Sequence, residues 1–174
     1  MRKRYPVTAL ALSVAGYLAI GGFEGYKDHV YIPVPGDFHT AGFGHADNRL
    51  PVGQHITENQ AVLWLSEDTK TAQNAVKRCV KVPLSQDEFN AYVSFSFNVG
   101  QPAFCNSTLV KKLNAGQYDQ ACEDLKLWVY SGGVKYKGLE TRRNIESMIC
   151  KHGRYPETPE WLKRFEPLFN EMSK

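Results

Sequence analysis

Glu24 is placed in the sequence where a carboxyl group could act as a general acid. Glu24 comes directly after 19 uncharged residues, and the run Thr40-Ala41-Gly42-Phe43-Gly44-His45 begins 16 positions later. We expect a glutamate at the edge of an apolar helix to be partly buried, which disfavours its charged form and keeps a proton available near neutral pH. The alternative is an interfacial acid that merely ends the apolar segment. Glu24 alone leaves both interpretations open.

Three histidines, His29, His39 and His45, raise the question of a metal site. Their spacing does not fit a helical pair of ligands, and the chain contains neither Cys-x-x-Cys nor His-Glu-x-x-His. We therefore expect no metal and no other cofactor. His45 is expected instead to brace its part of the fold through hydrogen bonds.

The segment from residue 24 to residue 56 is expected to form a small lobe built on a β-hairpin. It is rich in Gly, Pro, Asp and His, with turn signals at residues 35–37 and 47–48. A capping box at Thr57 then opens a long helix over residues 57–77. This helix is expected to link the small lobe to the rest of the chain.

The remainder, residues 78–174, is predicted to be a helical lobe. A capping box at Ser85 opens a core helix that ends at Gly100. Further helices are expected at residues 107–115, 119–130 and 139–150, and after Pro159, where Pro167 interrupts an amphipathic pattern. The fold class is therefore α+β, mainly helical, with residues 24–174 forming one domain of two lobes.

The first 23 residues have the pattern of a segment that inserts into membranes. Arg2, Lys3 and Arg4 precede the uncharged run Tyr5–Phe23, which is close to the length of about 20 residues that spans a bilayer. Nine of its 19 residues are Gly, Ala, Ser or Thr, so the gain from insertion is small and we expect a conditional anchor. The positive-inside rule places residues 24–174 in the periplasm. A signal peptide cleaved near Ala19-Ile20-Gly21 and a core helix of a soluble protein are the alternatives.

Composition and cysteine content agree with an exported globular domain. The chain has 174 residues, 43% of them hydrophobic, and its 21 Lys and Arg are mixed with 18 Asp and Glu, which excludes a nucleic-acid-binding stripe. Cys79, Cys105, Cys122 and Cys150 suggest two disulfides in an oxidising compartment. Three pairings are possible from sequence, and we favour Cys79 with Cys150 and Cys105 with Cys122. We expect a monomer.

An ordered set of motifs resembles the phage-type lysozymes, the muramidase endolysins. The set covers roughly residues 23–153 and consists of Glu24-Gly25, Tyr31, Gly36, the run 40–45, Phe97-Asn98-Val99-Gly100, Ser107-Thr108-Leu109, residues 121–128, Gly138-Leu139 and Arg142-Arg143. The basic start and weakly hydrophobic first segment most resemble the signal-anchor-release endolysins. The resemblance implies a lysozyme-like two-lobed fold and hydrolysis of the β-1,4 bond between N-acetylmuramic acid and N-acetylglucosamine in peptidoglycan.

The resemblance also assigns catalytic roles. Glu24 would protonate the leaving oxygen, while an aspartate nine residues later and a threonine six further on would hold the attacking water. Position 33 is a proline here and Thr40 falls one position late, so we expect Asp37 with Thr40 to take this role. Turn chemistry is the alternative for Asp37.

Three further residues receive supporting roles from the same resemblance. Arg142 or Arg143 would pair with Glu24, and Asn98 would line the sugar site. The alternatives are a solvated helix face for the arginines and a satisfied helix-end amide for Asn98.

The implied biology is host cell lysis by an enzyme that is first tethered, inactive, to the inner membrane through residues 5–23. Release of this segment would free the enzyme into the periplasm, where peptidoglycan is the substrate. A lytic transglycosylase, which needs one glutamate and no aspartate, is the nearest alternative. A membrane-anchored wall-binding protein without catalysis is the other.

Overall fold

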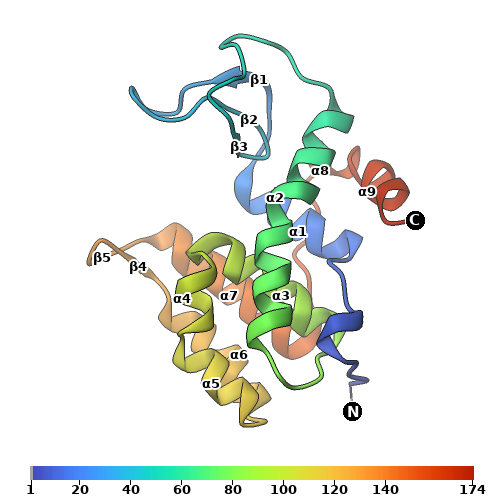
Figure 1. Cartoon of the computed structure of the whole chain (residues 1–174), viewed down its shortest axis with the longest axis vertical. Coiled ribbons are helices and arrows are strands. Elements are labelled where there is room, and N and C mark those ends of the chain that lie inside the picture. Colours follow the sequence, from blue (N-terminus) through green and yellow to red (C-terminus); the bar gives the residue numbers. More distant parts are fainter. Residues whose placement is uncertain (1) are drawn as a thin grey trace. The chain divides into compact units, whose positions relative to one another are not determined.

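The computed structural model describes residues 2–174 and shows a mostly helical protein with a small antiparallel sheet, which confirms the α+β class (Figure 1). The helices of this part of the chain are η1 (Val7–Ala9, 3-10), α1 (Val14–Glu24), α2 (Glu58–Cys79), α3 (Gln86–Val99), α4 (Gln101–Cys105), α5 (Thr108–Asn114), α6 (Tyr118–Asp124), η2 (Leu125–Leu127, 3-10), α7 (Lys137–His152), α8 (Glu160–Lys163) and α9 (Glu166–Met172). The strands are β1 (Lys27–Tyr31), β2 (Thr40–Gly42), β3 (His45–Ala46), β4 (Tyr130–Ser131) and β5 (Val134–Lys135).

The chain divides into two compact units. Unit 1 contains the residues up to Gly16 together with Thr71–Pro156, and unit 2 contains Tyr17–Lys70 together with Glu157–Lys174. Helix α2 begins in unit 2 and ends in unit 1. Helix α2 was predicted over residues 57–77, and it begins one residue later and ends two residues later than predicted.

Helix α3 forms the core of unit 1, as its sequence pattern predicted. The Ser85 hydroxyl accepts a hydrogen bond from the Glu88 N–H, and the Glu88 side chain returns one to the Ser85 N–H, which completes the capping box. Phe89, Tyr92 and Phe95 are fully buried. Helix α7 packs along α3 and ends at Gly153, whose left-handed backbone (φ 62°) closes the helix. Hydrogen bonds join the two helices, among them one from the Ser94 hydroxyl of α3 to Glu146 of α7 at 2.7 Å.

The chain after α6 differs from the predicted helix over residues 119–130. Helix α6 ends at Asp124, and after the short helix η2 the chain forms the hairpin β4–β5. Gly132 and Gly133, which follow the predicted helix, both have positive φ (55° and 80°) and form the turn of this hairpin. A pair of glycines can follow a helix or form a hairpin turn, so the sequence pattern did not distinguish the two.

The disulfide pairing favoured from sequence is wrong. The structure pairs Cys79 with Cys105, at a Cα–Cα distance of 5.5 Å, and Cys122 with Cys150, at 5.6 Å. The reason is tertiary: Cys79 ends α2 beside the end of α4, whereas α6 packs against α7. Each bond therefore joins helices that are near neighbours in the fold.

Removing the second disulfide should weaken unit 1. Replacing both Cys122 and Cys150 by serine is expected to lower the free energy of unfolding by about 3–4 kcal/mol, because this bond closes a separation of 28 residues in the unfolded chain. For a protein of this size that corresponds to a fall in Tm of roughly 10 °C. Circular dichroism melting without reductant measures it, and an unchanged Tm in the double variant would contradict the expectation.

Unit 2 contains the sheet β1-β2-β3, in which both strand pairs are antiparallel. Residues 32–39 connect β1 to β2, and the turn expected at residues 35–37 lies in this connection. The β1–β2 register is irregular: Lys27 lies opposite Gly42, and Tyr31 lies opposite Thr40. The connection ends at Thr40, which is the first residue of β2.

The C-terminal helices α8 and α9 belong to unit 2, whereas the sequence grouped them with the helical lobe. Pro167 lies in the first turn of α9, and the predicted single helix is broken between α8 and α9. The grouping arises because Phe165 and Phe169 pack on Phe43, with ring centroids 5.0 Å and 6.1 Å apart. Phe169 also stacks on Tyr17 at 5.2 Å.

The uncharged run near the N-terminus does not form one continuous helix. It contains η1, an extended stretch and the 11 residues of α1. Within residues 2–174, no helix combines the length and apolar character needed to cross a bilayer.

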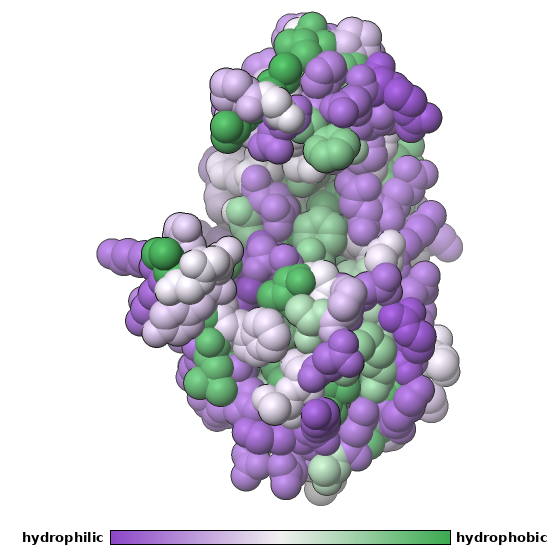
Figure 2. Space-filling view, turned by 60° about the vertical axis from the view of Figure 1, so that its left-hand side comes forward, coloured by the Kyte–Doolittle hydropathy of each residue, from purple (hydrophilic) through white to green (hydrophobic). Residues whose placement is uncertain are grey.

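Small residues in this run permit close packing. A Cβ on Gly16 would lie 2.9 Å from the Asn90 side chain, and one on Gly21 would lie 3.2 Å from the Phe43 ring. A larger side chain at either position would require these neighbouring side chains to shift. The face shown in Figure 2 is mainly hydrophilic, with apolar residues in small groups.

Candidate active site

Glu24 is the last residue of α1 and lies beside the β2–β3 turn. The helix ends because Gly25 takes a positive φ of 73°, with its N–H bound to the Gly21 carbonyl at 3.0 Å. A Cβ built on Gly44 would lie 4.0 Å from Glu24 Oε2. The sequence predicted partial burial of Glu24, but the residue is exposed at this helix end. The carboxyl group is thus accessible and adjoins a glycine that leaves space next to it.

The β2–β3 turn consists of Phe43 and Gly44, and Gly42 is the last residue of β2. Phe43, between Gly42 and Gly44, is 3% exposed and contacts the aromatic cluster formed with Phe165 and Phe169. Gly42 approaches α2 closely, since a Cβ there would lie 3.2 Å from the Cβ of Ala61. The Gly-Phe-Gly sequence therefore fixes the turn against two helices while keeping its outer edge free of side chains.

Thr40 and Asp37 occupy different environments within unit 2. Thr40 is buried at the start of β2, and its hydroxyl donates to the Phe38 carbonyl at 3.0 Å. The lone pairs of this oxygen can still accept a hydrogen bond from a water. Asp37 lies in the exposed connection, where its N–H binds the Val34 carbonyl at 2.9 Å. The turn interpretation of Asp37 is therefore correct, and its catalytic role stays a prediction.

His45 joins the sheet to α2. Its ring stacks on Trp64, with centroids 4.4 Å apart, and Nδ1 is 3.0 Å from Asp68 Oδ2. His39 and His29, the other two histidines considered as metal ligands, have separate partners. His39 Nδ1 is 2.7 Å from the Leu50 carbonyl oxygen, and His29 Nδ1 is 2.8 Å from Asp28 Oδ1. Within residues 2–174, no group of three His, Cys, Asp or Glu side chains could hold a metal ion.

Asn98, Arg142 and Arg143 come together in unit 1 around Glu146. Arg142 Nε and Arg143 Nη1 donate to the two Glu146 oxygens at 3.1 Å and 2.8 Å, and the Ser94 hydroxyl donates to the same carboxylate at 2.7 Å. Arg143 Nη2 in turn binds the Asn98 amide oxygen. The solvated-face interpretation of the arginines is wrong, because both are buried. Pairing of either arginine with Glu24 stays a prediction.

Burial changes the electrostatics of this group. Desolvation lowers the pKa of Arg143, while the charge of Glu146 and its hydrogen bond act in the opposite direction. Arg143 Nε also donates to the Trp128 carbonyl at 3.1 Å, and its guanidinium lies 4.9 Å from the centre of the Phe95 ring. The network therefore holds Asn98, near the end of α3, through a buried guanidinium that also binds Glu146 and the Trp128 carbonyl.

Sequence reasoning missed two acids that bind predicted site residues, one in each unit. Glu146 follows Arg142 by four residues and Arg143 by three, a spacing that places all three side chains on one helix face and could have revealed it. Asp68 lies in α2, far from His45 in sequence, and no local pattern identifies it. Its partner is determined only by the packing of the sheet against α2.

A small sheet followed by a long helix and a mainly helical remainder, with a glutamate ending the first helix, defines a lysozyme-like fold. The family model described as phage lysozyme matches residues 21–146, and the chain belongs to this family of lysozyme-type glycoside hydrolases. It is 34% identical over 149 residues to the "SAR-endolysin" of Bacteriophage PS119, covering 83% of this chain and 89% of that one.

Two further comparisons agree. The endolysin of Bacillus phage B103 is 38% identical over 143 residues, 82% of this chain, but the chain spans only 54% of the length of that relative. The solved endolysin from Escherichia coli O157:H7 phage FAHEc1 superposes with a TM-score of 0.78 at 33% identity, covering 90% of this chain and all of that chain.

Proposed function

We propose that this protein is an endolysin that hydrolyses the β-1,4 bond between N-acetylmuramic acid and N-acetylglucosamine in peptidoglycan. The observation that carries the proposal is the position of Glu24: an accessible carboxyl group at the end of α1, next to the glycine-edged β2–β3 turn. A general acid must reach the leaving oxygen of a bulky polymer, and an open position beside a rigid turn permits this. Family membership supplies the reaction class.

In this reaction Glu24 would donate its proton to the glycosidic oxygen as the bond breaks. An oxocarbenium-like centre then forms on the sugar and must be attacked by water. Thr40 fits the role of holding this water, because its hydroxyl hydrogen is committed to the Phe38 carbonyl and its oxygen can only accept. The water would donate a hydrogen bond to the Thr40 oxygen, so the lone pairs of the water oxygen would point away from Thr40 and remain available for attack on the sugar. Asp37, three residues earlier, would take the proton of the water after a movement of its exposed turn.

Replacing the Thr40 hydroxyl tests the water site. Thr40→Val is expected to lower kcat about 100-fold with little change in KM, because the lost contact acts at the attack step and not in substrate binding. Thr40→Ser keeps the hydroxyl and should retain activity within about tenfold of wild type. Initial rates on purified peptidoglycan measure both, and equal activity of the valine variant would remove Thr40 from the mechanism.

We propose further that the protein reaches the periplasm through a membrane anchor formed by residues 5–23 and is released when this segment leaves the bilayer. The basic residues before the run, its content of small residues and the relation to "SAR-endolysin" proteins support this. Glu24 directly follows the segment, so an anchored chain would hold the acid at the membrane surface. Folding of α1 with the rest of the protein would then complete the site.

The products of purified peptidoglycan distinguish the proposed reaction from its alternatives. After borohydride reduction, mass spectrometry should find muramitol at the new chain ends. Anhydromuramic ends would instead show a lytic transglycosylase, and reduced glucosamine ends would show cleavage of the other glycosidic bond. An intact glycan would leave only the wall-binding interpretation.

A further inference from the structure

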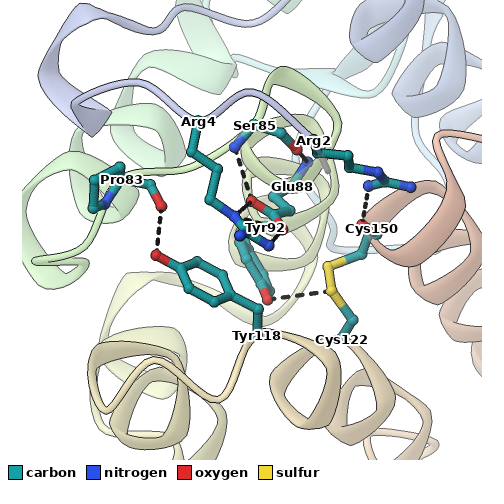
Figure 3. Close-up of polar contacts among 9 residues, drawn as sticks. All are labelled: Arg2, Arg4, Pro83, Ser85, Glu88, Tyr92, Tyr118, Cys122 and Cys150. Atoms are coloured by element: carbon teal, nitrogen blue, oxygen red, sulfur yellow. Dashed lines mark hydrogen bonds and ion pairs between the residues drawn. A yellow bond between two sulfur atoms is a disulfide. The ribbon is translucent and has the colours of Figure 1, made fainter.

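Arg4, one of the N-terminal basic residues, is bound in unit 1 by a site centred on Glu88 of α3. Arg4 Nε and Nη2 donate to Glu88 Oε2 and Oε1 at 2.9 Å and 2.7 Å, so the guanidinium meets both carboxylate oxygens (Figure 3). The Arg4 guanidinium also lies 3.6 Å from the centre of the Tyr118 ring. Tyr118 is in turn held by a hydrogen bond from its hydroxyl to the Pro83 carbonyl at 2.9 Å. Arg4 is therefore held by a two-point ion pair and an aromatic ring.

Glu88 cannot lose this partner without cost. Its side chain is only 3% exposed, and its Oε2 also accepts the Ser85 N–H at 2.8 Å as part of the capping box of α3. With Arg4 absent, a buried carboxylate would keep one backbone donor and no positive charge. The site is thus built into α3 and requires a cation.

The main chain next to Arg4 is bound as well. Tyr5 and Leu84 exchange two backbone hydrogen bonds, at 2.8 Å and 2.9 Å, and an Arg2 nitrogen donates to the Cys150 carbonyl. Further along the same segment, the Asn90 amide donates to the Ser13 hydroxyl at 2.7 Å. Contacts from Arg2 to Ser13 therefore join this N-terminal segment, residues 2–13, to the part of unit 1 formed by residues 71–156.

We propose that Glu88 and Tyr118 form a binding site for Arg4. We call these three residues the latch, because they would hold residues 2–13 against residues 71–156 of unit 1 after release from the membrane. This rests on the proposed releasable anchor. In the anchored chain Arg4 lies on the cytoplasmic side of the membrane, whereas Glu88 is periplasmic. The same guanidinium cannot occupy both places, so membrane and latch compete for one residue. When Arg4 binds Glu88, the buried carboxylate gains a positively charged partner, and this favours the released state.

Hydrogen exchange on the purified soluble chain tests the latch directly. Arg4→Gln and Glu88→Gln should each make the amides of residues 5–12 exchange roughly ten- to a hundredfold faster, because loss of a charge-assisted contact raises the population of the open segment by that factor. Amides of α7 should be unchanged. Glutamine at position 88 can still accept the Ser85 N–H, so the capping box survives.

Lys3→Gln is the matched control, because it removes the same charge from the same cluster but not the contact with Glu88. Its exchange should equal that of wild type. The double variant Arg4→Gln/Glu88→Gln should exchange no faster than the worse single variant, since both changes break one interaction. Equal exchange in Lys3→Gln and Arg4→Gln, or wild-type exchange in Glu88→Gln, would overturn the latch.

Cell fractionation then separates the latch from the anchor on which it rests. The released, soluble fraction should fall several-fold in Arg4→Gln and Glu88→Gln but not in Lys3→Gln. If wild type is never found in membranes, the releasable anchor fails while the exchange data still report on the contact. If exchange accelerates but release is equal in all variants, Glu88 only stabilises the fold and the latch proposal is wrong.

Discussion

Glu24→Gln is expected to lower the rate of peptidoglycan hydrolysis about 1,000-fold, the effect of removing a general acid from a glycoside hydrolase. Glutamine has nearly the same shape but no acidic proton to donate. Because Glu24 is exposed at the end of α1, the free energy of unfolding should change by less than about 0.5 kcal/mol. Turbidity loss of chloroform-treated cells measures the activity, and thermal melting measures the stability.

Glu67→Gln provides the control for this loss. Glu67 is also exposed and lies in the part of α2 that belongs to the same unit, so the substitution makes the same chemical change on the same unit. It should leave both activity and Tm unchanged. If Glu24→Gln clears cells as fast as Glu67→Gln, the catalytic assignment of Glu24 is wrong.

Glu146→Gln should destabilise the protein by about 3–5 kcal/mol, because it leaves the charges of two buried arginines without their shared carboxylate. Both Glu146 oxygens accept hydrogen bonds from Arg142 and Arg143, and the Glu146 side chain is fully buried. Urea unfolding followed by circular dichroism measures the loss. Activity should fall as well, since Arg143 holds Asn98.

Glu140→Gln is the matched substitution on the same helix. Glu140 pairs with Lys135 at 3.0 Å, and both side chains are nearly half exposed, so solvent screens the pair. Its removal should cost at most about 1 kcal/mol. A loss of similar size in the two variants would show that the Glu146 network does not stabilise unit 1.

Local signals in the sequence predicted much of the fold. The capping box at Ser85 and the glycine at position 100 correctly predicted both ends of α3, because caps depend on residues within one helical turn. The turn signals at residues 35–37 likewise indicated the connection between β1 and β2. These features depend on short-range sterics and hydrogen bonding, which a single sequence displays.

Features that depend on tertiary packing could not be predicted in this way. The disulfide partner of Cys79 depends on where α4 lies, and the grouping of α8 and α9 with unit 2 depends on Phe43 receiving Phe165. The exposure of Glu24 was missed because the apolar run before it suggested a continuous helix. The run instead contains η1, an extended stretch and the short helix α1, and Glu24 is exposed at the end of α1.

Digestion of purified peptidoglycan in water enriched in oxygen-18 tests whether Glu24 acts as the general acid of a hydrolysis. Wild type is expected to produce muramic acid ends carrying one heavy oxygen each, because water attacks the sugar after Glu24 protonates the leaving group. Glu24→Gln should produce about 1,000-fold fewer labelled ends in the same time. Equal labelling by the two proteins, or glycan cleavage by wild type without label, would contradict this mechanism.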